Sequence, residues 1–410
     1  MEHVLITDVK TITCAPQTGC NLLMVKVETN QPGLIGWGCA TFTQRYLTVE
    51  NMIQNYLKPL MVGRDALSIE DNWNLMNTNA YWRNGPVLNN AISGIDQALW
   101  DILGKAAGMP VWQLLGGKAR TGVPVYRHVK GQSPQELADK ILQMKEEDGI
   151  TYFRCQLNAE GVSSYGGCQN SFLAPAKPYP SGVYCDARSY LRSVPTLFEY
   201  LREHVGWEIE LLHDVHERLS PNEALQLAKS VEPYKLFYLE DVLPPDKTEW
   251  LSVIRSQCAT PLAMGELFNN VMEYKPLITN RLIDYVRCHI SQIGGLTPAK
   301  KLAAFAEFFG VKTAWHGPGD VSPFGHVCNL HLSLASSSTG ILEWFGIDQD
   351  ERICELFTGI PQQMGNYVYA NDLPGWGIEF HEEKASKYPA DPSTILWTQT
   401  RLPDGSLLTP

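Results

Sequence analysis

The chain has 410 residues, a formal net charge of −11 and a pI near 5.4. This acidity argues against a nucleic-acid-binding protein, because phosphates require clusters of Lys and Arg. The sequence shows neither a basic and apolar leader nor an apolar run of about 18 residues, so we expect no signal peptide, no membrane contact and a cytoplasmic location. The ten cysteines are scattered without CxxC pairs, which indicates reduced thiols.

The first third of the chain predicts an α+β domain. Residues 1–46 alternate in the manner of antiparallel strands, with turn residues at Gln31, Pro32 and Gly33. From Val49 to Gly117 apolar residues recur three and four positions apart, which is typical of helices.

From residue 123 onward, short apolar strands alternate with helical segments, which indicates a parallel sheet. The eight expected strands are Val123–Val129, Tyr152–Leu157, Glu208–Val215, Phe237–Asp241, Pro261–Glu266, Tyr285–Ile290, Lys312–His316 and Gly340–Trp344. Helices fit between them, for example at Ser133–Glu147, Pro221–Val231 and Thr297–Phe309. Gly294 and Gly295 are interpreted as a tight turn rather than a phosphate loop.

The predicted fold class is therefore α/β, a (β/α)7β TIM-type barrel with an α+β capping domain. The expected boundaries are 1–122 for the capping domain, 123–375 for the barrel, and 376–410 for a C-terminal segment that returns to the capping domain. A doubly wound sheet is disfavoured because no G-x-G-x-x-G follows the first strand.

One long segment interrupts the barrel pattern. Residues 158–189 are rich in Gly, Ser, Pro and Tyr and follow the second strand. A loop of this length is usually functional or disordered. We interpret it as a cover over the barrel mouth, with an incidental insertion as the alternative.

Three acidic residues, Asp214, Glu240 and Glu266, close apolar runs at equal intervals along the chain. The carboxyl ends of parallel barrel strands meet at the active-site face. A single acid at a strand end is more often a helix cap or a surface charge, but three on successive strands favour a metal site. Oxygen-only ligands select a hard cation, so the sequence predicts Mg²⁺.

Residues suited to acid–base chemistry occur near the same strand ends. Because strand side chains alternate, His216 points to the same side as Asp214, whereas His213 points under the helices. An imidazole exchanges a proton near neutrality, so His216 is a candidate acid or base. Arg154 ends the second strand and Tyr165 lies in the inserted segment; an arginine near a tyrosine favours the phenolate. Taken singly, arginines more often pair with surface acids and loop tyrosines more often pack.

Further polar residues are expected around the barrel mouth, where they suit an anionic, polyhydroxylated small molecule. They are His128, Arg287, His316, Asp320 and Glu343. For Asp320 the alternative is a cap on the next helix.

At this point the sequence resembles the mannonate dehydratase group of the enolase superfamily over nearly its whole length. The matching motifs are Ala80–Arg83, Arg154–Gln156 followed by Tyr165–Gly166, His213–His216, Gly265–Glu266, Ile283–Arg287, His316–Asp320 and Pro374–Ile378.

The resemblance implies a Mg²⁺-dependent dehydratase of a hexonate such as D-mannonate or D-gluconate. Asp214, Glu240 and Glu266 would bind Mg²⁺. Tyr165, tuned by Arg154, would remove the C2 proton, and His216 would protonate the departing 3-hydroxyl to give a 2-keto-3-deoxy acid. The positions that contact the sugar acid would be His128, Glu266, Arg287, His316, Asp320, Glu343 and Thr43, which replaces the asparagine of the family.

Two other hypotheses for the function stay open. A relative with weak or no turnover would bind a sugar acid or metabolite in a regulatory role. Racemase or epimerase chemistry would need a second base, and the expected lysine motif on the second strand is absent. The relatives also imply a symmetric homo-oligomer.

Overall fold

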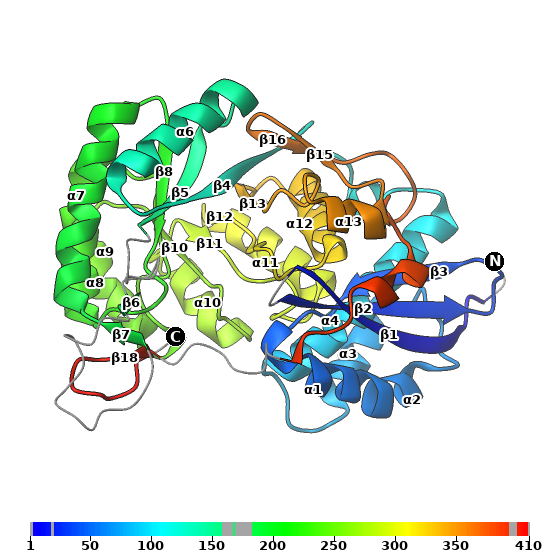
Figure 1. Ribbon diagram of the computed structural model, residues 1–410. Helices are drawn as coiled ribbons and strands as arrows, with labels where there is room; N and C mark the ends of the chain where they lie inside the picture. The colour runs from blue at the N-terminus through cyan, green and yellow to red at the C-terminus, as the bar shows by residue number, and fades with distance from the viewer. Residues whose placement is uncertain (1–2, 18–19, 158–166, 169–182, 393–399, 409–410) are drawn as a thin grey trace.

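The computed structural model describes residues 3–17, 20–157, 167–168, 183–392 and 400–408. Its first part is an antiparallel sheet of β1 (Ile6–Gln17), β2 (Cys20–Thr29) and β3 (Ile35–Cys39), packed on the helix α4 (Pro86–Ala107) (Figure 1). Gly36 and Gly38 leave no room for a side chain between β3 and α4, which explains their close approach. The shorter helices are α1 (Tyr46–Met52), α2 (Lys58–Met61), α3 (Ile69–Thr78) and α5 (Val111–Leu114). The predicted capping domain is confirmed.

The second part is a barrel of eight parallel strands, and each lies within a predicted strand or differs from it by two residues at one end. They are β4 (Val123–Gly131), β5 (Tyr152–Leu157), β8 (Glu210–Asp214), β9 (Tyr238–Glu240), β10 (Leu262–Met264), β11 (Tyr285–Val286), β12 (Lys312–Thr313) and β13 (Leu342–Glu343). Neighbours pair in chain order, and the barrel closes because β13 pairs with β4 and Thr313 pairs with Thr339. The predicted fold class is confirmed.

Most observed strands are shorter than predicted because the chain leaves the ladder at the mouth. His216, Asp241 and Gly265 follow three successive strands and have φ values of 56°, 38° and 138°. Such left-handed backbone cannot continue a strand. The strand ends therefore turn outward, which is how they present side chains to the barrel mouth.

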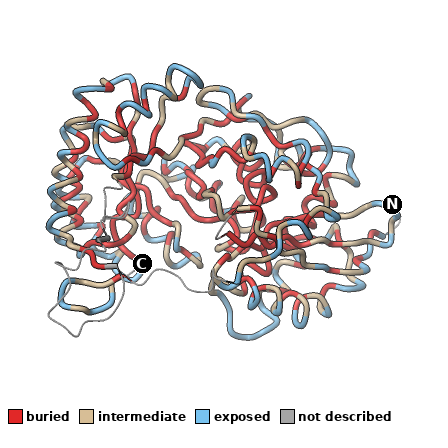
Figure 2. The backbone as a smooth tube through the Cα atoms, in the orientation of Figure 1, coloured by how far each residue is buried: buried red, intermediate tan, exposed pale blue. Residues whose placement is uncertain are grey.

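Helices cover the outside of the barrel, and the predicted ones are found within one residue at each end. They are α6 (Pro134–Asp148), α7 (Ala187–Val205), α8 (Pro221–Ser230), α9 (Leu251–Gln257), α10 (Val271–Thr279), α11 (Leu296–Phe308) and α12 (Pro323–Ala335). The expected cap is present, since Ser133 Oγ accepts the N–H of Glu136 at 3.1 Å. Buried residues follow the strands and α4, whereas exposed residues lie on the outer faces of α6 and α7 (Figure 2). The barrel interior is filled by Tyr126, Leu212, Tyr238, Ala263, Ala314 and Ile341.

The chain after β13 folds back across the molecule. It forms α13 (Glu351–Leu356), β14 (Phe357–Thr358), β15 (Gln362–Met364), β16 (Tyr367–Tyr369) and β17 (Glu379–Phe380). Trp376 donates its backbone N–H to Asp101 Oδ1 and its Nε1–H to Trp37 O, both at 2.9 Å. We propose the boundaries 1–122, 123–375 and 376–410, which these contacts with the capping domain support. Further on, β18 (Thr400–Arg401) lies beside β7 (Val183–Cys185) instead, and β7 in turn pairs with β6 (Gly167–Cys168).

The described residues also bear on the predictions about membrane-spanning segments and about the cysteines. No helix among them combines the length and the apolar character needed to cross a membrane. The nine cysteines whose side chains are described are all free thiols, as predicted, and eight of them are buried.

His331 on α12 is buried where three parts of the chain meet. Its Nδ1 accepts the backbone N–H of Trp112 at 3.2 Å, and its ring packs edge-on against Trp376. Burial, assisted by the charge of Lys118, lowers the pKa of His331 to about 3. Its pKa in the unfolded chain is about 6.5.

Between these two pH values the unfolded chain binds a proton that the native protein does not. The free energy of unfolding should therefore rise with pH by about 1.4 kcal/mol per unit on account of this group. In His331→Asn the Asn Oδ1 can replace Nδ1 as acceptor, so we expect a shallower dependence. Urea denaturation at several pH values between about 4 and 6.5 measures both slopes; equal slopes would contradict the assignment.

Candidate functional site

The predicted acidic residues lie together at the carboxyl ends of β8, β9 and β10. Asp214 and Glu240 are direct neighbours in the parallel ladder, and both are fully buried. Glu266 lies two residues beyond the end of β10 and is partly exposed. Carboxylate oxygens of Glu240, Asp241 and Glu266 lie within 4.8 Å of one another. The strand ends thus bring the three predicted ligands to one place and add a fourth acid, Asp241.

The role of Asp241 follows from its hydrogen bonds. Its Oδ1 accepts the N–H of Gly265 at 2.9 Å, and its backbone oxygen accepts the N–H of Glu217 at 2.8 Å. Asp241 therefore ties the end of β9 to the segments that carry Glu266 and His216. The sequence does not single it out, because it directly follows Glu240 and its side chain would alternate to the other face of the strand.

Burial and mutual repulsion dominate the electrostatics of this cluster. Burial, together with the neighbouring charges of Glu266 and Asp214, raises the pKa of Glu217 to about 9. The pKa values of Glu240 and Asp241 also lie well above their usual range, mainly because of burial. A bound cation would remove this penalty.

The donor set fits a hard divalent cation. Glu240 Oε2 is buried and accepts no hydrogen bond from the described residues. The cluster of Glu240, Asp241 and Glu266 offers carboxylate oxygens, which suit Mg²⁺ rather than a soft metal.

Two arginines lie beside the acids. Arg154 Nη1 is 3.3 Å from Asp214 Oδ2 and 3.6 Å from Glu240 Oε1. Arg287 Nε is 2.6 Å from Glu240 Oε1, and its Nη2 donates to Glu343 Oε2 at 2.7 Å. The side chain of Arg287 is entirely buried and pairs with Glu240 and Glu343 at once.

Glu343 is the centre of a second buried network. It accepts hydrogen bonds from Arg287 and from the N–H of Gly317, and His128 Nε2 lies 2.6 Å from its Oε1. Arg154 Nη2 lies 3.3 Å from His128 Nδ1, and arginine only donates, so Nε2 of His128 carries the proton. Burial and the charge of Arg154 lower the pKa of His128 to about 4, consistent with a neutral ring.

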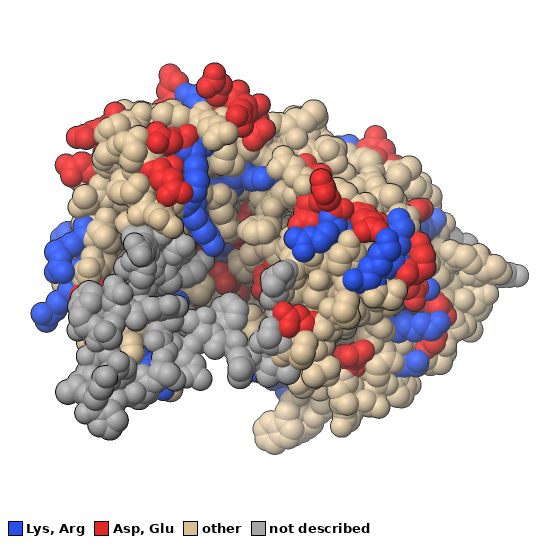
Figure 3. Space-filling model, in the orientation of Figure 1, with Lys and Arg blue, Asp and Glu red and all other residues tan. Residues whose placement is uncertain are grey.

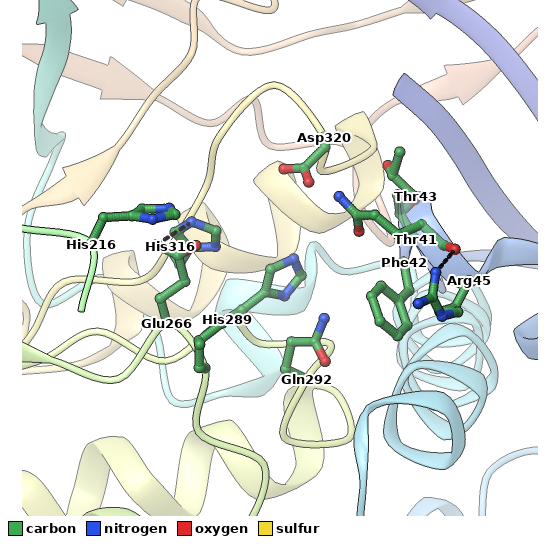
Figure 4. Close-up of a pocket in the computed structure, with 12 residues that line it drawn as sticks. Thr41, Phe42, Thr43, Arg45, His216, Glu266, His289, Gln292, His316 and Asp320 are labelled. Carbon is green, nitrogen blue, oxygen red and sulfur yellow. Dashed lines mark hydrogen bonds and ion pairs between the residues drawn. The ribbon is translucent and has the colours of Figure 1, made fainter. Parts of the chain in front are cut away.

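A cavity of about 300 Å³ opens between the acidic strand ends and the capping domain (Figure 4). Of the predicted residues it is lined by Thr43, His216, Glu266, His316 and Asp320. The lining residues not foreseen from the sequence are Thr41, Phe42, Gln44, Arg45, Leu267, His289 and Gln292. The cavity therefore joins the metal-binding candidates to side chains of the capping domain.

His316 connects the cavity to the acids. Its Nε2 lies 3.1 Å from Glu266 Oε2. Burial alone would raise the pKa of Glu266, but His316, His216 and Arg287 together lower it below the usual range. His216 is held by its backbone N–H, which donates to Asp214 Oδ1 at 2.8 Å. Both histidines line the cavity beside Glu266, so they are placed to contact a bound molecule.

The other predicted site residues differ in where the structure places them. His128, Arg287 and Glu343 are not among the residues that line the cavity and instead form a buried network with one another. Asp320 is not the cap of α12, because Ser322 occupies that position. Tyr165 lies outside the described residues, as does most of the predicted cover segment.

His213 packs under the helices, as predicted. Its Nε2 lies 2.7 Å from the hydroxyl oxygen of Tyr190, and its ring meets that of Phe198 edge-on.

Among the described atoms of the face shown in Figure 3, Lys and Arg are mixed with Asp and Glu, and acidic atoms are visible in the central hollow. The described part of this face therefore shows no continuous basic patch of the kind that binds phosphates.

Comparison with known families matches both parts of the chain. Residues 5–116 match the N-terminal domain of the mandelate racemase and muconate lactonizing enzymes. Residues 136–384 match the enolase C-terminal domain-like family.

Similar proteins cover the whole chain. D-galactonate dehydratase family members from Musicola paradisiaca and Enterococcus gallinarum are 49% and 48% identical, over 100% and 99% of both chains. A crystal structure of an enolase from Pantoea ananatis with bound D-gluconate and Mg is 48% identical, with a TM-score of 0.94. The match covers 99% of this chain and 100% of that one.

Proposed function

Because the chain belongs to the enolase superfamily and, within it, to the D-galactonate dehydratase family, we propose that it is a Mg²⁺-dependent hydro-lyase acting on a sugar acid. The observation that carries this proposal is the convergence of Asp214, Glu240 and Glu266 beside a polar cavity that also contains His216. Acids, an imidazole and room for a small polar molecule are the parts that proton removal next to a carboxylate requires.

The proposed Mg²⁺ ligands are Asp214, Glu240 and Glu266. Asp241 lies in the same cluster, and its hydrogen bond to the N–H of Gly265 supports a positioning role for it beside these ligands. Bound Mg²⁺ would stabilise the negative charge that the substrate carboxylate gains when the neighbouring proton leaves.

The proposed proton transfers use residues of this chain. Tyr165, whose phenolate Arg154 would favour, removes the proton from C2. His216 then gives a proton to the 3-hydroxyl, which leaves as water, and the resulting enol tautomerises to a 2-keto-3-deoxy acid. The place of His216 at the cavity wall, close to Asp214 and Glu266, supports this role.

Direct contacts to the sugar acid are proposed for Thr43, Glu266, His316 and Asp320, which line the cavity. His128, Arg287 and Glu343 are proposed to complete the substrate site as a connected network, because their side chains are bound to one another. The substrate we propose is a hexonate, D-gluconate or D-mannonate. The D-gluconate bound to the Pantoea ananatis protein supports the former.

The test is a panel of epimeric hexonic and pentonic acids with purified protein and Mg²⁺, in which 2-keto-3-deoxy product is detected by carbonyl derivatisation. Product from one stereochemical class establishes the dehydratase and names its substrate. If no acid is converted but one of them raises the melting temperature of the Mg²⁺-loaded protein, the regulatory binding role replaces it.

We also propose that the chain forms a homo-oligomer. Its exposed aromatic side chains support this, since Tyr81, Trp82 and Phe308 are 80%, 82% and 86% exposed. Exposed apolar groups of this size are common at protein interfaces.

A further inference from the structure

Two cavity residues outside the proposed catalytic set, His289 and Gln292, lie on the turn that follows β11. Both line the cavity (Figure 4), where they lie between His316 on one side and Phe42 of the capping domain on the other. An open-chain sugar acid whose carboxylate lies at the proposed metal site would place its more distant carbons beside these two side chains.

The hydrogen bonds of His289 fix its tautomer. Its Nδ1 accepts the backbone N–H of Ser291 at 3.1 Å, so this nitrogen holds a lone pair. The proton of the neutral ring is then on Nε2. Since His289 is only 6% exposed and lines the cavity, it offers a single, oriented donor to a bound molecule.

The turn that carries both residues is held by backbone hydrogen bonds. The N–H of Gln292 donates to His289 O at 3.0 Å, and that of Gly295 donates to Ile290 O at 2.9 Å. Gly294 and Gly295 have φ values of 98° and 103°, which only glycine adopts without strain, so the predicted tight turn is confirmed.

Two side chains of the capping domain also donate hydrogen bonds to this turn. Asn89 Nδ2 donates to Gln292 O at 2.7 Å, and Trp73 Nε1 donates to Gly294 O at 2.8 Å. The backbone of Gln292 is thereby positioned, while its carboxamide remains at the cavity wall.

We propose that His289 and Gln292 are specificity-determining residues that bind the hydroxyl groups beyond C3 of the sugar acid. The inference rests on the proposed function. His289 supplies one fixed donor, and the carboxamide of Gln292 supplies both a donor and an acceptor. An epimer whose hydroxyl points elsewhere leaves these groups unpaired, and unpaired polar groups are what make such a site selective.

The test compares kcat/KM for D-gluconate and D-galactonate, which differ only at C4. We expect Gln292→Ala and His289→Phe each to lower kcat/KM for the preferred epimer by about 10-fold and to lower it less for the other, so that the ratio falls. His289→Gln keeps an N–H donor and should recover part of the loss. Gln143→Ala, on the exposed face of α6, is the matched control. Melting curves establish that the variants fold.

The outcomes separate the two claims. If the wild type converts one epimer but Gln292→Ala and His289→Phe leave the ratio unchanged, this inference is wrong while the dehydratase stands. A wild type that neither converts nor binds any acid of the panel overturns the proposed function and this inference with it.

Discussion

Replacing His216 by Asn is expected to abolish dehydration while leaving removal of the C2 proton intact. Asn cannot protonate the departing hydroxyl, so kcat/KM for product formation should fall by about 10² to 10⁴. Tyr165 still removes the C2 proton in this variant, and the intermediate returns to substrate. In D₂O the C2 position of recovered substrate should therefore acquire deuterium, which proton NMR detects as loss of the C2–H signal.

Tyr165→Phe should behave differently, because the proposed base itself is gone. We expect loss of both product formation and C2 exchange. His204→Asn on the exposed end of α7 and Tyr56→Phe, at a residue that is 64% exposed, are matched controls that should retain full activity. Wild-type turnover in His216→Asn, or normal C2 exchange in Tyr165→Phe, would show that the roles are wrongly assigned.

The second large effect is expected on stability. Arg287 lies with no exposed side-chain surface between Glu240 and Glu343, at 2.6 and 2.7 Å. Arg287→Met leaves two buried carboxylates without this partner. Breaking a buried ion pair in this way costs about 3–5 kcal/mol, and the free energy of unfolding from urea denaturation measures it.

Arg255→Met is the matched control. Arg255 also binds a carboxylate with two hydrogen bonds, at 2.7 and 2.8 Å from Asp284, but both side chains are about one-third exposed. A partly exposed pair contributes about 0–1 kcal/mol. If Arg287→Met loses no more stability than Arg255→Met, the acids of the site do not depend on the buried guanidinium.

The architecture and the convergence of the acids could be predicted from the sequence. Apolar runs that end in Asp214, Glu240 and Glu266 carry a strong periodic signal, and the parallel topology then determines that their ends meet. The same reasoning placed His213 under the helices, because side-chain alternation holds up to the end of β8.

Other parts of the site depend on contacts that one sequence does not contain. Arg287 and Glu343 were predicted as contacts to the sugar acid, and one sequence does not reveal that they also pair with each other in a buried network. His289 and Gln292 lie in a turn beyond the last regular residue of β11, where no periodicity applies. Thr41, Phe42 and Arg45 reach the cavity from a separate domain.

The most direct test of the central claim is the metal dependence of turnover. Protein treated with a chelator and then dialysed should form no 2-keto-3-deoxy acid from its preferred hexonate, and addition of Mg²⁺ should restore the full rate. Glu240→Gln, which weakens the proposed ligand set, should require far more Mg²⁺ for the same rate. Turnover that persists without the metal, or an absence of product from every hexonate when Mg²⁺ is bound, would contradict the account.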